Sequence, residues 1–215
     1  NLVSGILLSS DKMVKVGDWI EMPSVGIDGT VVDMTLNTVK VRGWDNTISN
    51  VSPYTLTTGT FKNWEGMVAS GGRRICRSVD IDINTVKFCS EELVGRIAKI
   101  ELMSDYIASL PEPRTQISNL ELLRVYIERY MEAQPWLNKQ MIHMVRHLQS
   151  SDVGVPLQVY AFTATTVWTE YERIQASLFE HIMAIAPLFD IRIFQRPSGS
   201  DIDKRTAVED IEKIV

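Results

Sequence analysis

The sequence predicts a β + α/β protein in which a small antiparallel β-barrel is followed by a ferredoxin-like βαββαβ domain with one inserted helix. Two observations lead to this prediction. Short β-prone runs separated by turn residues recur about every ten residues up to residue 51. After residue 74, an alternating strand pattern and helical apolar stripes follow one another in the order β-α-(α)-β-β-α-β, which is a split βαβ arrangement.

Four strands are expected in the first domain, over residues 18–22, 30–32, 37–41 and 47–51. Asp28-Gly29 and Asp45-Asn46 are turn pairs between these strands. Pro53 ends the run because proline cannot donate to a strand ladder. The spacing is typical of an antiparallel barrel, here of the Sm-like kind, or of a sandwich.

Gly66, Gly71 and Gly72 indicate a linker or hinge over residues 63–74. Beyond it, residues 75–83 alternate with one apolar face, which predicts a half-buried strand. Ser90 is the expected N-cap of a helix that ends before Pro111. The inserted helix, residues 117–133, carries the capping box Ser118-x-x-Glu121.

The rest of the second domain is expected to contain strands over 141–148 and 157–163, a helix over Trp168–Ile185 and a last strand over 188–194. The tail, residues 201–215, is charged and weakly amphipathic, so it is expected to be helical or disordered.

Composition narrows the classes of function. Hydrophobic content is 45% and charged content 23%, which is ordinary for a globular protein. The net charge is −5, with the acidic excess after residue 89, and this argues against a nucleic-acid binder. Cys76 and Cys89 give no disulfide framework, which favours reduced thiols in a cytosolic setting.

The start of the chain indicates a piece of a longer protein, because the first residue is not Met. No stretch reaches the about 18–20 apolar residues of a membrane span, and the first ten residues lack the basic region of a signal peptide. We therefore expect the chain as given to be soluble.

Candidate chemistry is sparse. His143 and His147 are four apart, as in helical zinc sites, but they lie in an expected strand without a third ligand, and His181 has no evident partner. Asp80 and Asp82 share a strand face, where a solvated pair is favoured over acid–base chemistry or Ca²⁺ binding.

Gly-rich catalytic and nucleotide-binding motifs are absent from the sequence. Residues 71–74, Gly-Gly-Arg-Arg, favour a linker with surface arginines over an anion site. We therefore expect a protein that is not an enzyme and that holds no cofactor or metal.

One alternative is a soluble binding module for RNA or protein. Tyr160 and Phe162 lie in an expected central strand, where ferredoxin-like RNA binders place base-stacking rings. That strand has no glycine and no basic residue, and the acidic balance opposes phosphate binding, so no nucleic-acid partner is expected.

Three motifs together carry a resemblance to a known family. Lys15-Val16-Gly17-Asp18, Gly29-Thr30-Val31 and 44–48 (Trp-Asp-Asn-Thr-Ile) resemble the β-domain of small-conductance mechanosensitive (MscS-type) channels. Asn1, Leu2 and Gly5 resemble the end of that family's pore-lining transmembrane helix. The family's "I-P-N"-like string is replaced here by Val-Ser-Pro-Tyr at 51–54, so its proline is displaced.

A closer resemblance is to the miniconductance (YbdG-like) branch of the family. It is carried by residues 28–31, 61–64, 70–74 and 194–199, and by the extra helix over 117–133. The resemblance implies the C-terminal cytoplasmic region of a channel: the end of a pore helix at 1–10, a β-domain at 11–62, a linker at 63–74 and an α/β domain at 75–200.

The resemblance also implies a function and partners. Subunits of such channels form homo-heptamers in the inner membrane, with a β-domain ring and a cytoplasmic cage that has side portals. Bilayer tension opens them during hypo-osmotic shock. Val16, Gly17, Asp18, Gly29, Thr30, Asp45 and Asn46 would be structural residues of the ring.

The ring also suggests two alternative roles for three large side chains. Trp19, Trp44 and Ile48 either pack between subunits or between strands, or they fill the barrel core. Without lipid and the preceding helices, we expect the chain alone not to form the heptamer.

Overall fold

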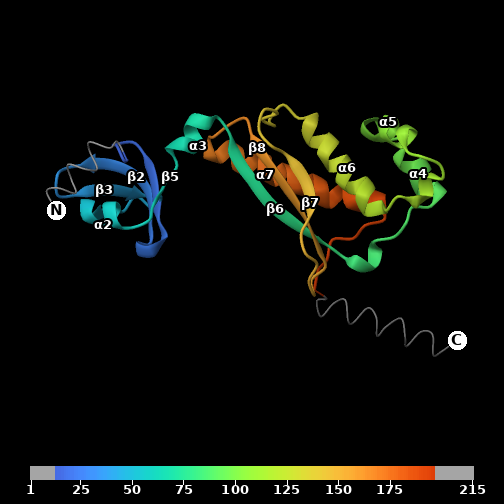
Figure 1. The fold of residues 1–215 in the computed structure, drawn as a ribbon, viewed down its shortest axis with the longest axis horizontal. Coiled ribbons are helices and arrows are strands. Elements are labelled where there is room, and N and C mark those ends of the chain that lie inside the picture. The colour runs from blue at the N-terminus through green and yellow to red at the C-terminus, as the bar shows by residue number, and fades with distance from the viewer. Residues whose placement is uncertain (1–12, 197–215) are drawn as a thin grey trace. The chain divides into compact units, whose positions relative to one another are not determined.

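The computed structural model describes residues 13–196. The expectations for Asn1, Leu2 and Gly5 and for the tail 201–215 lie outside this range. The chain divides into two compact units, residues 1–72 and 73–215, and each is described by itself (Figure 1). No helix among residues 13–196 is both long and apolar enough to cross a membrane.

The first unit is built on a five-stranded antiparallel sheet in the order β4-β3-β2-β1-β5. Its strands are β1 (Trp19–Met22), β2 (Ile27–Met34), β3 (Val39–Gly43), β4 (Ile48–Val51) and β5 (Lys62–Asn63). The four expected strands are confirmed. The sequence missed β5 because a two-residue strand has no periodic signal.

Gly29 corrects one expectation, because it lies inside β2 and not in a turn. The turn before β2 is formed by a 3-10 helix, Pro23–Val25, and by Gly26 in the left-handed region. Gly29 pairs with Ile20 on one side and with Gly43 on the other. A Cβ atom at Gly29 would lie 2.1 Å from the carbonyl oxygen of Arg42, so glycine is required there for close strand approach.

One face of this sheet forms the core of the unit. The buried side chains are Val14, Ile20, Met22, Val31, Val39, Val41, Val51 and Leu56. Leu56 comes from α2 (Pro53–Thr58), whose N-cap is Ser52. Pro53 thus ends the strand run as expected and also begins a helix, at the position where its missing N–H costs nothing.

The expected linker is partly ordered secondary structure. After β5 comes α3 (Glu65–Ser70), which ends at Gly71 with a φ of 70°. Gly71 is therefore a left-handed helix cap rather than a marker of irregular chain.

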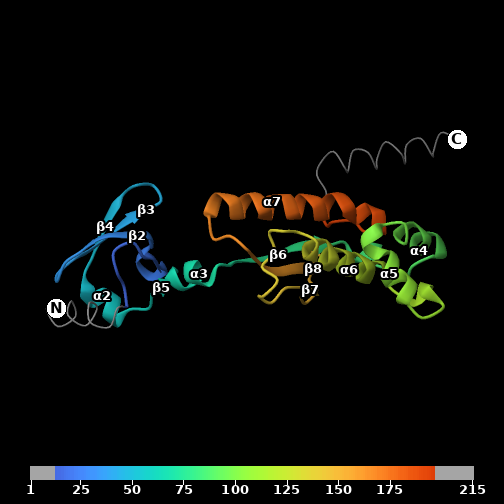
Figure 2. The ribbon, with the colours of Figure 1, turned by 90° about the horizontal axis from the view of Figure 1, so that it is seen from above.

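The second unit has a three-stranded antiparallel sheet in the order β6-β8-β7. The strands are β6 (Arg73–Ile81), β7 (Met144–His147) and β8 (Val155–Thr163). The helices are α4 (Glu91–Ile97), α5 (Glu101–Ser109), α6 (Asn119–Glu132) and α7 (Trp168–Ile185). Figure 2 shows α7 running along one side of this sheet.

Three expected elements differ in this unit. The helix expected between Ser90 and Pro111 is two helices, because Ile100 adopts an extended conformation between them. The strand expected over 188–194 is replaced by a 3-10 helix, Ala186–Phe189, followed by a single bridge between Ile193 and Ile81. The first expected strand stops at Ile81, and Ile83 is exposed.

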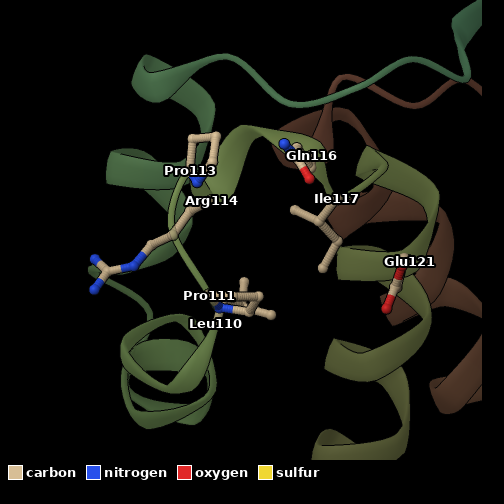
Figure 3. Close-up of a pocket in the computed structure, with 7 residues that line it drawn as sticks. All are labelled: Leu110, Pro111, Pro113, Arg114, Gln116, Ile117 and Glu121. Carbon is tan, nitrogen blue, oxygen red and sulfur yellow. The ribbon is translucent and has the colours of Figure 1, made fainter.

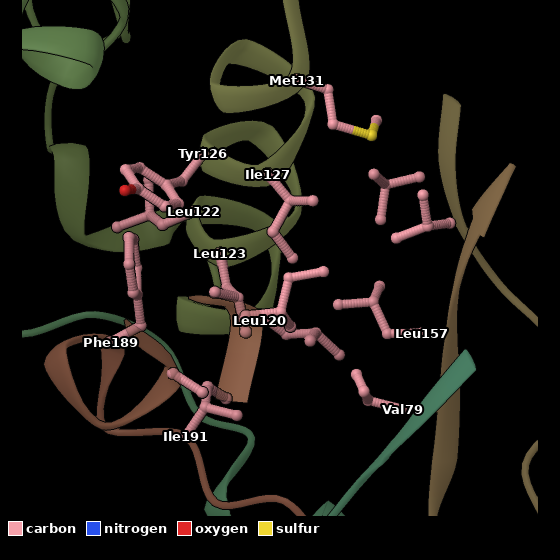
Figure 4. Close-up of a cluster of buried hydrophobic side chains, with 14 of the residues drawn as sticks. Val79, Leu120, Leu122, Leu123, Tyr126, Ile127, Met131, Leu157, Phe189 and Ile191 are labelled. Carbon is pink, nitrogen blue, oxygen red and sulfur yellow. The ribbon is translucent and has the colours of Figure 1, made fainter. Parts of the chain in front are cut away.

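The helix α6 belongs to the core of this unit. Figure 4 shows its side chains Leu120, Leu123 and Ile127 pointing toward Val79 of β6 and Leu157 of β8. The N-cap of the expected capping box is confirmed, since the Ser118 hydroxyl accepts a hydrogen bond from the Glu121 amide at 3.1 Å.

Candidate functional site

The turn that leads into β1 contains Val16, Gly17 and Asp18. Gly17 has a φ of 99°, and its amide donates to the Val31 carbonyl at 2.8 Å. The Val31 amide in turn donates to the Asp18 carbonyl at 2.9 Å. These bonds bring Val16-Gly17-Asp18 against Gly29-Thr30-Val31, two of the three motifs that carried the family resemblance.

Asp18 is a buried carboxylate, with only 2% of its surface exposed. Its Oδ2 accepts hydrogen bonds from the Lys15 amide at 3.1 Å and from Asn63 Nδ2 at 2.7 Å. Its Oδ1 accepts no hydrogen bond from the described residues and lies 3.9 Å from Lys15 Nζ. A buried carboxylate needs such partners, because removing a charge from water is costly.

Asn63 connects three separate parts of the first unit. Besides its bond to Asp18, its Nδ2 donates to the Met13 carbonyl at 3.1 Å. Its Oδ1 accepts from the Glu65 amide at 2.9 Å. The segment that enters the sheet (residues 13–18) is thereby tied to the segment that leaves it (residues 62–65). We call Asp18, Asn63 and these partners, Met13, Lys15 and Glu65, the entry–exit joint.

Sequence reasoning missed this joint. Asp18 stood in one family-like motif and Asn63 in another, but they lie 45 residues apart, and no periodicity links such positions. The signal that was available is the pairing of a short acidic motif, Gly-Asp, with an amide side chain beside Trp64.

Three tryptophans form a row on the same unit. Trp19 stacks on Trp64 at a centroid distance of 4.8 Å and meets Trp44 edge-on at 5.4 Å. Trp44 is 49% exposed, and Ile48 is exposed too. Of the two roles considered for Trp19, Trp44 and Ile48, filling the barrel core is therefore wrong, since none of them is among its buried residues.

The third motif forms the turn between β3 and β4. Asp45 Oδ1 accepts from the Thr47 hydroxyl at 2.7 Å and from the Thr47 amide at 3.0 Å. These bonds lower the pKa of Asp45. Asn46 adopts a φ of 66°, which asparagine tolerates. The expected turn role of Asp45-Asn46 is confirmed.

Three of the titratable groups considered for chemistry, Asp82, His143 and His181, have structural partners. Asp82 caps a 3-10 helix and pairs with Arg192 at 3.2 Å. His143 Nδ1 lies 3.0 Å from the Met141 carbonyl, and His181 stacks on Tyr130 at 3.9 Å. Burial raises the pKa of the Cys89 thiol to about 11, so it is not a reactive thiolate. Residues 13–196 hold no cluster of three or more metal-ligating side chains.

A cavity of about 180 Å³ lies between the loop after α5 and the start of α6. Figure 3 shows Leu110, Pro111 and Ile117 around it, while the Arg114 guanidinium points away. The carboxylate at its edge, Glu121, accepts a hydrogen bond from the Tyr106 hydroxyl at 3.4 Å. This lining offers no nucleophile and no paired acid and base.

The sheet of the second unit has one face that the helices do not cover. Arg74, Tyr160 and Phe162 lie on it, with the Arg74 guanidinium 5.8 Å from the centre of the Tyr160 ring. The Tyr160 and Phe162 rings meet edge-on at 5.9 Å. If the protein were a binding module for RNA or protein, this face would be its binding surface.

The part of the chain that contains the entry–exit joint matches a known protein family. Residues 1–66 match the family model of the mechanosensitive ion channel β-domain. This stretch contains the joint, all three motifs and the five-stranded sheet.

The chain is similar to proteins of the MscS family of mechanosensitive channels.

Curated members of the MscS family match over most of the chain. The low conductance mechanosensitive channel YnaI of Escherichia coli is 24% identical over 185 residues, which are 86% of this chain and 44% of YnaI. An uncharacterized MscS family protein of Helicobacter pylori is 25% identical over 194 residues, 86% of this chain and 29% of that protein. The chain thus spans less than half the length of these relatives.

Solved MscS-type structures show the same fold. The cryo-EM structure of Arabidopsis thaliana MSL1 has a TM-score of 0.64 at 11% identity and covers 91% of this chain and 58% of its own. The crystal structure of Helicobacter pylori MscS in its closed state has a TM-score of 0.60 at 14% identity, with coverages of 92% and 62%. The mixed sheets and helices match the fold of these MscS-type structures, and YnaI is named as a mechanosensitive channel.

Proposed function

We propose that this chain is the C-terminal cytoplasmic region of a channel subunit that opens under membrane tension during hypo-osmotic shock. The observation that carries the proposal is the match of residues 1–66 to the mechanosensitive channel β-domain. Tension favours whichever state occupies more membrane area, so a channel with a wider open state is opened by stretching the bilayer.

The partners follow from this role. The subunit assembles as a homo-heptamer, contacts lipid through helices that precede residue 1, and lies on the cytoplasmic side of the inner membrane. Exposed Trp44 and Ile48 and the outer strands β4 and β5 support a ring, because neighbouring copies would cover both the apolar side chains and the sheet edges.

Finer assignments belong to the same proposal. We assign 11–62 to an Sm-like β-domain and 75–200 to a ferredoxin-like domain, in which β8 lies between β6 and β7 as a split βαβ requires. Asn1, Leu2 and Gly5 would end the pore-lining helix. The motifs at 28–31 and 61–64 and the helix α6 support the miniconductance branch.

An osmotic-shock assay tests the function. The full-length parent protein is expressed in a bacterial host that lacks its own tension-gated channels, and survival and solute release are measured after transfer to dilute medium. We expect rescue that an empty vector does not give. Correct membrane insertion without any rescue or solute release would contradict the proposal.

The alternative, a soluble RNA- or protein-binding module, is supported by the uncovered sheet face with Arg74, Tyr160 and Phe162. The two functions differ in what precedes residue 1. Several apolar spans of about 20 residues there would favour the channel, and a soluble domain would favour the module.

A further inference from the structure

The entry–exit joint has a mechanical consequence for a tension-gated channel. We propose that Asp18 and Asn63 are positioning residues that make the segment entering the β-domain and the segment leaving it move as one body. Force arriving before residue 13 then passes to residue 63 across hydrogen bonds rather than through β2, β3 and β4. This inference rests on the proposed function, because it concerns how the channel opens.

The connectivity supports this shortcut. Along the chain, 45 residues separate Asp18 from Asn63, and the bond between them closes that loop at 2.7 Å. Asn63 Nδ2 also donates to the Met13 carbonyl, at the start of the described chain. Asn63 Oδ1 accepts from the backbone amide of Glu65, at the start of α3. Two more backbone links run parallel, from Ile20 to Asn63 and from Trp64 to Trp19.

Burial makes this joint stronger than its neighbours. Hydrogen bonds to a carboxylate are shorter and stronger than neutral ones, and Asp18 is 2% exposed. The nearby ion pairs Lys15–Glu65 and Lys62–Glu21 involve lysines that are 66% and 62% exposed, so they contribute little. Separating the two segments would therefore mean breaking the contacts of Asp18 and Asn63 as well as the two backbone links.

The joint also couples any movement of the entry segment, residues 13–18, to the exit segment, residues 62–65. While it holds, residues 13–18 cannot shift without carrying residues 62–65 and whatever follows them in the chain. A weakened joint would free the entry segment from that load. The tension needed to open the channel should then fall.

Replacing the Asp18 carboxylate by an amide tests this proposal. In Asp18→Asn the negative charge is lost, and only a neutral, weaker acceptor remains for Asn63 Nδ2 and the Lys15 amide. We expect a lower opening pressure in patches containing the full-length protein. In the isolated 215-residue chain, the Glu65 and Lys15 amides should exchange about ten- to a hundredfold faster than in wild type. Adding Asn63→Asp restores a charge-assisted hydrogen bond with donor and acceptor exchanged, and should return both readouts part of the way.

The matched control is Asp33→Asn, the same chemical change on β2 in a surface pair with Lys40. It should move neither readout. An unchanged opening pressure in Asp18→Asn, with faster amide exchange, would overturn the proposal and leave the joint as a purely structural contact. If the wild-type protein carries no current, the proposed function fails instead, and unchanged amide exchange in Asp18→Asn would still refute the joint.

Discussion

At the scale of single residues, Gly29 and Asn63 contact residues that lie far from them along the chain. The capping residues Ser90 and Ser118 were predicted correctly, because each cap involves residues three apart. Gly29 was expected in a turn but lies where two strands approach closely, and Asn63 was not singled out. Both roles depend on residues far along the chain, which local patterns do not reveal.

Gly29 gives a sharp test of that close approach. We expect Gly29→Ala to lower the free energy of unfolding of the first unit by about 2–3 kcal/mol, since the new Cβ would overlap the Arg42 carbonyl. Gly66→Ala is the control, because nothing lies within 4 Å of a Cβ there and alanine is the better helix former. Urea titration followed by tryptophan fluorescence measures both. Equal stability of the two variants would refute the close-approach role.

His181 predicts a pH effect on the second unit. Burial lowers the pKa of His181, whose Nε2 lies 2.9 Å from the Tyr126 hydroxyl. The unfolded chain therefore binds this proton more readily than the folded one. The stability due to neutral His181 is complete above the ordinary pKa of 6.5, declines as the pH falls below it, and is gone below the lowered folded pKa.

The measurement is the urea midpoint of wild type and His181→Gln between pH 7.5 and about pH 5, where ordinary histidines titrate. The wild type should lose more stability on acidification than the variant, which has no titrating ring. Parallel pH profiles for the two proteins would show that this histidine does not contribute.

At the scale of elements, the inserted helix α6 is part of the core of the second unit. α6 buries Leu122, Leu123 and Met131 completely, and Asn119 at its start donates to the carbonyls of Thr85 and Phe189. The apolar stripe predicted the helix, but not that it would supply so much of the core. Neighbouring elements decide that, and sequence periodicity only marks which face is apolar.

The Ser118 cap of α6 should therefore contribute to the stability of the whole second unit. We expect Ser118→Ala to cost about 1 kcal/mol of unfolding free energy, because the Glu121 amide loses its acceptor. Ser109→Ala, at an exposed helix end, is the comparison and should cost less. Thermal denaturation by circular dichroism would decide, and an equal loss in both variants would contradict the assignment.

At the scale of the whole molecule, the sequence predicts the order of the main elements but not the number of strands in each sheet. Turn spacing and apolar stripes predicted β1 to β4 of the first unit and the long helices α6 and α7 of the second. β5 and the replacement of the last expected strand were missed. Those features depend on Asn63 and on the left-handed Asp190, whose conformations are fixed by tertiary contacts.

Assembly is a property of the complete subunit in this account. We expect the isolated 215-residue chain to remain a monomer of about 24.3 kDa in light scattering. A heptameric ring would need the membrane helices that precede it. The full-length protein in detergent should have seven subunits. A stable heptamer of the isolated chain would overturn this expectation.

The central claim is that bilayer tension opens a pore made by the parent protein. The most direct measurement is patch-clamp recording of purified full-length protein in liposomes while suction is increased stepwise. We expect step-like currents that appear above a reproducible pressure and vanish when suction is released. Inserted, assembled protein that stays silent up to the pressure that ruptures the membrane would contradict it.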